Sequence, residues 1–108
     1  MNNERLAATM KLHLAIGFPN VPENDAFEDW FFQLAEMGPW VYAMGLQVLR
    51  GKEVNTQSLV EDLKDLIATF ESIDKEMLNS DDWEIYLQCR ENVRSIESMV
   101  NAILQFRK

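Results

Sequence analysis

Two pairs of acidic residues have the spacing by which helical hydrolases hold magnesium. Asp62 and Asp65 are three residues apart, as are Glu71 and Asp74. Residues at this spacing are neighbours on a helix, where two carboxylates can share a cation. The apolar seam of this segment, however, directs Asp65 and Glu71 outward, and Asp62 and Asp74 fall on opposite flanks. Four diverging carboxylates do not make one octahedral site, so we expect neither a metal nor a cofactor.

Residues for nucleophilic or acid–base catalysis do not form a workable set. His13 is the only histidine, and Met10 and Ile16 offer it no polar partner three residues away. A general base needs a group that orients it. Cys89 is the only cysteine and falls on an apolar helical face, which favours packing over nucleophilic attack. We therefore predict that the chain is not an enzyme.

Negative charge is the strongest polar signal. The 108 residues include 18 acidic and 10 basic ones, for a net charge of -8. Residues 54–88 contain nine acidic and two basic residues, which gives -7 for that segment. Such a charge repels nucleic-acid phosphates and favours a basic protein surface. Six acidic residues between positions 61 and 76 are too few to mimic duplex DNA, which presents about 13 charges over the same length.

Six residues are candidates for contact with a basic protein. The electrostatic contact is assigned to four carboxylates, with one of two aromatic side chains as anchor: Asp65, Glu71, Asp81, Asp82, and Phe32 or Trp40. A solvated acidic face without a partner accounts for the same charge. The basic residues of the last helix are expected to pair with acidic residues of the helices, as Arg94 can with Glu91 and Glu97, each three residues away.

The function predicted from these residues is a small acidic, non-catalytic protein-binding module that inhibits or sequesters a basic protein. Immunity proteins and antitoxins that block basic nucleases share these general properties, but the likeness is one of class and no motif carries it. The alternative is a homo-oligomeric structural or regulatory protein, such as a homodimer, that uses the aromatic helix 27–49 as its interface. Adjacent Phe31 and Phe32 point in different directions, so one neighbouring helix does not cover both.

Helical periodicity predicts an all-α fold in a single domain, 1–108. A first helix is expected over residues 3–16. A second begins after Asp25 as its N-cap, has a break or kink at Gly38–Pro39, and continues to Gly51.

The last half of the chain contains two apolar seams with heptad spacing. The first consists of Leu59, Leu63, Leu66, Phe70, Ile73 and Met77, and the second of Tyr86, Cys89, Val93, Ile96, Val100 and Ile103. The short turn between them, 79–81, predicts a long C-terminal antiparallel helical hairpin. Apolar residues flanking both seams need further cover, which predicts a four- or five-helix bundle.

The sequence also predicts the compartment. Its longest uncharged run, residues 37–49, is too short to span a bilayer, so no membrane association is expected. Lys11 and His13 interrupt what would be the apolar part of a signal peptide. A single cysteine excludes an internal disulfide and suits a reducing environment. We expect a cytoplasmic protein.

Overall fold

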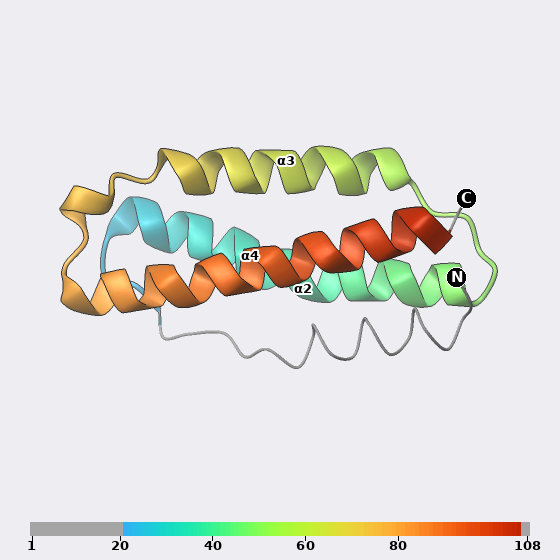
Figure 1. Ribbon diagram of the computed structural model, residues 1–108, viewed down its shortest axis with the longest axis horizontal. Helices are drawn as coiled ribbons and strands as arrows, with labels where there is room; N and C mark the ends of the chain where they lie inside the picture. Colours follow the sequence, from blue (N-terminus) through green and yellow to red (C-terminus); the bar gives the residue numbers. More distant parts are fainter. Residues whose placement is uncertain (1–20, 107–108) are drawn as a thin grey trace.

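The computed structural model describes residues 21–106, which form three α-helices and one short 3-10 helix (Figure 1). The elements are α2 (Asp25–Leu49), α3 (Thr56–Ser72), η1 (Lys75–Met77) and α4 (Ser80–Phe106). Helices α2 and α4 run in the same direction and α3 runs opposite to both, and each helix packs against the other two. The all-α prediction is confirmed, whereas the predicted four or five helices are not matched by the three described. The helix expected over residues 3–16 lies outside the described residues.

Helix α2 is one continuous element. Its N-cap is Asn24, one residue before the predicted cap Asp25, and Asn24 Oδ1 accepts a hydrogen bond from the Phe27 N–H at 3.0 Å. Of the predicted break or kink at Gly38–Pro39, the break does not occur, because α2 passes through Pro39 without interruption. Proline removes one helical hydrogen bond, but Met37 and Val41 are buried on either side of it, and this packing holds the helix together.

Helix α3 is shorter than its predicted seam. The first four seam residues, Leu59, Leu63, Leu66 and Phe70, are buried as predicted. The helix ends at Ser72, and Met77 lies in η1 with 70% of its surface exposed. Asp74 explains the early end, because its carboxylate accepts the Glu76 N–H at 3.1 Å and so caps a new short helix.

Helix α4 contains the second predicted seam, and all six of its residues are buried. Its first turn is capped by Asn79, whose Oδ1 accepts the Asp82 N–H at 2.7 Å. Helices α3 and α4 are antiparallel, as predicted, but α4 packs more extensively against α2 than against α3. The hairpin is therefore part of a three-helix arrangement around α2.

A row of stacked aromatic rings joins the three helices in the core. Trp30 of α2 stacks on Phe70 of α3 with ring centroids 4.5 Å apart, and Phe70 stacks on Tyr86 of α4 at 4.6 Å. Trp83 covers the outer side of Tyr86 at 5.2 Å. The buried indole N–H of Trp30 also donates to the Leu66 carbonyl at 2.9 Å. Trp30 therefore binds α2 to α3 both by stacking and by a hydrogen bond.

Replacing Trp30 with Phe should lower the free energy of unfolding by about 1–3 kcal/mol, because it removes the bond to Leu66 and leaves part of the ring volume empty. Urea titrations followed by circular dichroism measure this loss. The matched control is Trp83→Phe, since Trp83 is 40% exposed and makes no such bond. Equal losses in the two variants would contradict the role given to Trp30.

Candidate functional site

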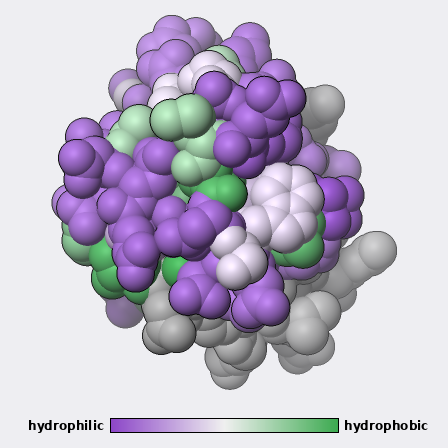
Figure 2. All heavy atoms as spheres, turned by 90° about the vertical axis from the view of Figure 1, so that its left-hand side faces the viewer, coloured by the Kyte–Doolittle hydropathy of each residue, from purple (hydrophilic) through white to green (hydrophobic). Residues whose placement is uncertain are grey.

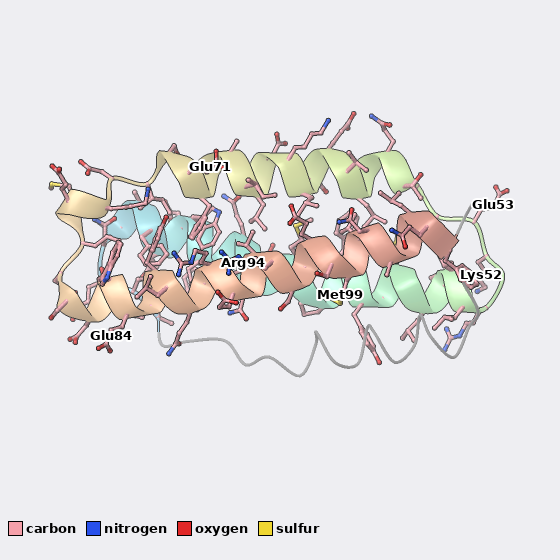
Figure 3. The ribbon with its side chains drawn as sticks, in the orientation of Figure 1. Lys52, Glu53, Glu71, Glu84, Arg94 and Met99 are labelled. Carbon is pink, nitrogen blue, oxygen red and sulfur yellow. The ribbon has the colours of Figure 1, made fainter. Side chains whose placement is uncertain are left out.

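The predicted contact residues fall in different places on the bundle. Asp65 and Glu71 are exposed on α3, and Asp81 is exposed in the first turn of α4. Figure 3 shows Glu71 on α3, apart from Arg94 on α4. Phe32 is 49% exposed and contacts Phe31 edge to face at 5.8 Å. Of the six candidates, Asp65 and Trp40 line one groove, and the adjacent Asp81 and Asp82 line another at the start of α4.

Asp65 and Trp40 line a groove of about 480 Å³ between α2 and α3. Its lining residues are Gln33, Glu36, Met37 and Trp40 from α2 and Asp62, Asp65 and Leu66 from α3. On each helix, every one of these residues has another of the set three or four positions away, so each set forms one continuous face. Glu36, Asp62, Gln33, Met37 and Leu66 were not among the predicted contact residues. The helical spacing to Trp40 and Asp65 is the sequence signal that could have found them.

The side chains of Asp62 and Asp65 are oriented differently from the sequence prediction. The sequence placed Asp62 on a flank of the helix and Asp65 on its outer face, yet both line the same groove. Three residues correspond to 300° of helical rotation, so their side chains project within about 60° of each other. Among the described residues, no group of three or more His, Cys, Asp or Glu side chains is placed to hold a metal ion.

Trp40 differs from Trp30 in its contacts. It is partly buried against the core, but within residues 21–106 no ring stacks on it and no cation lies over it. Its indole N–H makes no hydrogen bond within this part of the chain, whereas the Trp30 N–H is bonded to Leu66. Within residues 21–106, Trp40 therefore lines the groove with neither a stacked ring nor a hydrogen bond to its indole N–H.

The carboxylates of the groove are not neutralised by the basic residues that the structure describes. Arg94 forms its ion pair with Glu91 on its own helix, at 2.9 Å, which is one of the two partners that the helical spacing predicted. The ammonium group of Lys75 lies 5.7 Å from the Tyr86 ring centroid. Asp62 and Asp65 have no ion pair in the described part of the chain.

Asp82 does not belong to the exposed acidic surface with which it was grouped. Its side chain is 1% exposed, and its two carboxylate oxygens accept the backbone N–H groups of Glu23 and Asn24, each at 2.9 Å. Asn79 completes the arrangement, with its amide donating to the Glu23 carboxylate at 3.1 Å. Asp82 thus caps the start of α2 from the first turn of α4. This role corrects its prediction as a contact residue.

Replacing Asp82 with Ala should cost roughly 2–4 kcal/mol of unfolding free energy, because two backbone N–H groups at the start of α2 lose their charged acceptor. Asp81→Ala is the matched control. Asp81 is exposed, and its loss removes only a favourable charge from a helix N-terminus, at less than about 1 kcal/mol. Chemical denaturation of both variants measures the difference, and similar stabilities would contradict the capping role.

Cys89 is fully buried in α4. Burial raises the pKa of its thiol to about 12. The thiolate is the reactive form, so the folded protein holds this residue as a neutral thiol at physiological pH.

Iodoacetamide should therefore leave Cys89 unmodified in the native protein at about pH 8 and alkylate it after unfolding in guanidinium chloride. Mass spectrometry of the intact chain follows the reaction. Because the raised pKa belongs to the folded state, raising the pH through the ordinary thiol range should increase the rate in the unfolded protein only. Rapid alkylation of the native protein would contradict this packing role.

The exposed apolar side chains outside the groove lie mainly at one end of the bundle. Figure 2 views the end at which α2 and α4 begin and shows hydrophilic side chains surrounding smaller pale and apolar areas. Trp83 and Met77 belong to the elements of this end, and the Trp83 ring is already stacked on Tyr86. No helix in the described part of the chain is long and apolar enough to cross a membrane.

Comparison of the chain with known protein families, with curated proteins and with solved structures found no significant match.

Proposed function

We propose that this chain is a small acidic, non-catalytic binding protein that sequesters and inhibits a basic protein partner, in the manner of an immunity protein. The observation that carries the proposal is the set of exposed carboxylates on α3 that no described basic residue neutralises. Like charges held close together on a rigid helix repel one another, and a basic partner relieves that repulsion. A cytoplasmic location accompanies the proposal, because the single buried thiol needs no oxidising environment.

Three of the predicted carboxylates remain in the proposed contact. Asp65 and Glu71 lie on α3, and Asp81 lies at the start of α4, all exposed. Asp82 is left out because its carboxylate is buried and bonded. Trp40 is preferred to Phe32 as the anchor, since Trp40 lies in a groove with two acidic residues of α3. Complementary charge of this kind accelerates encounter and selects the partner.

The homo-oligomer alternative has less support from the structure. It needs the aromatic face of α2 to be free, yet Phe27, Trp30 and Phe31 are buried within the described chain. Phe32 and the partly buried Trp40 are the aromatic side chains of α2 that stay accessible for such an interface, with Tyr42 partly buried beside them. Sedimentation velocity distinguishes the alternatives, because a tight dimer weakened by Phe32→Ala would favour the homo-oligomer.

Reversing the charges of Asp65 and Glu71 to Lys should slow association with the basic partner by roughly tenfold and flatten its salt dependence. The partner is first captured from host lysate on the immobilised wild-type chain and identified by mass spectrometry. Its association rate is then measured by surface plasmon resonance at several salt concentrations.

The matched control is Glu53→Lys with Glu97→Lys, which changes the net charge equally at exposed sites outside α3. Figure 3 shows Glu53 in the loop after α2, away from Glu71. Unchanged affinity in the α3 variant, or equal slowing in both variants, would dismiss the proposed contact.

A further inference from the structure

We propose that the groove between α2 and α3 receives an arginine side chain of the basic partner, with its guanidinium group against Trp40 and between the acidic residues of the groove. This inference rests on the proposed function and names the chemical group that the site recognises. It follows from the shape, the charge and the aromatic surface of the groove taken together.

The shape of the groove suits a long side chain with a charged end. Buried Met37 and Leu66 contribute apolar lining, at 7% and 3% exposure. The methylene stem of an arginine can lie along such a surface while its charged end stays near polar groups. A volume of about 480 Å³ is of the size that binds small ligands, so one such side chain fits with room for neighbouring atoms of the partner.

The charge of the groove favours a cation. Glu36, Asp62 and Asp65 line it, and no described basic residue does. All three are exposed and without an ion pair in the described chain. They are not arranged to hold a bare metal ion. A cation that brings its own hydrogen-bond donors and an apolar stem therefore matches these carboxylates better than an inorganic ion.

Trp40 favours guanidinium over ammonium. Its ring face has no aromatic or cationic partner within residues 21–106. A planar guanidinium group stacks on an indole and can also donate two parallel hydrogen bonds to a carboxylate, whereas an ammonium group acts as a point charge. Asp62 and Asp65 lie on the facing helix as acceptors for those donors.

The walls of the groove are held by contacts within the core. Leu66, which lines it, is also the residue whose carbonyl accepts the buried Trp30 N–H. This bond ties α3 to α2 at the edge of the groove, and Phe70, one turn further along α3, stacks on the same indole. A site with fixed walls loses little conformational entropy when it binds.

The test uses the full chain and the three indole N–H signals of its three tryptophans in two-dimensional NMR. The probes are a short arginine-containing peptide and two analogues, in which lysine or the neutral isostere citrulline replaces arginine. The arginine peptide should shift the Trp40 signal and leave the Trp30 signal in place. The lysine peptide should bind several-fold more weakly, at about a third of the affinity or less, and the citrulline peptide should not bind detectably.

Variants then locate the contact. Asp65→Asn and Trp40→Leu should each weaken binding of the arginine peptide by about fivefold or more, measured by calorimetric titration because Trp40→Leu removes the Trp40 signal. Glu61→Gln, on the same helix but outside the groove lining, should change binding by less than about twofold. An unmoved Trp30 signal shows that each variant is folded. Asp65→Asn keeps most of the side-chain volume, and Trp40→Leu removes only a partly buried ring, so the core is retained in both variants.

Several results would overturn the inference. One is an equal loss of peptide binding in Asp65→Asn and Glu61→Gln, with shifts spread over all acidic residues. Another is equal affinity for the arginine and lysine peptides. A Trp40 signal that moves with protein concentration in the absence of peptide would show that a second copy of the chain occupies the groove. The proposed function is tested separately. If the wild-type chain captures a basic protein and the Asp65 and Glu71 reversal abolishes that capture, the proposed function stands without a role for this groove.

Discussion

The buried indole of Trp30 is the contact on which the arrangement of the three helices depends. It donates to a carbonyl of α3 and stacks on Phe70, which in turn stacks on Tyr86 of α4. A hydrogen bond of this kind is directional, so it fixes the rotation of α2 against α3 in a way that apolar packing alone does not. The face of α2 that carries Trp40 is oriented by the same contact, because both residues belong to one continuous helix. The Trp30 contact therefore helps to set both the packing of the core and the geometry of the groove.

The two acidic environments of the molecule follow from different physical causes. Asp82 is buried because two backbone N–H groups at the start of a helix need an acceptor, and a carboxylate supplies one for each. Asp62 and Asp65 are exposed, and the described residues provide them with no cation. Charge that is used inside the fold is thus separated from charge that is left for a partner. Only the second kind contributes to the proposed binding.

The features that could be predicted from the sequence are those set by local spacing. The seam from Leu59 to Phe70 and the whole seam of α4 are buried as predicted, because helical periodicity depends on neighbouring residues alone. Helix α2 continues through Pro39 because of tertiary packing, which local rules for proline do not take into account. The cap by Asp82 joins residues 59 positions apart, and the groove joins faces of two helices, so neither was accessible to spacing arguments along one segment. Trp40 and Asp65 were predicted as contact residues, but from composition and exposure rather than from their meeting in one groove.

The long-range cap by Asp82 also has a consequence for the order in which the protein can mature. Synthesis proceeds from the N-terminus, so α2 leaves the ribosome well before the residue that accepts its first N–H groups. Until the second turn of α4 has been made, Phe70 of α3 also lacks Tyr86 beside it. A nascent chain that contains only α2 and α3 therefore lacks both the Asp82 cap and the Tyr86 ring, which belong to the same end of the bundle. Native structure at that end is reached only after α4 has been made.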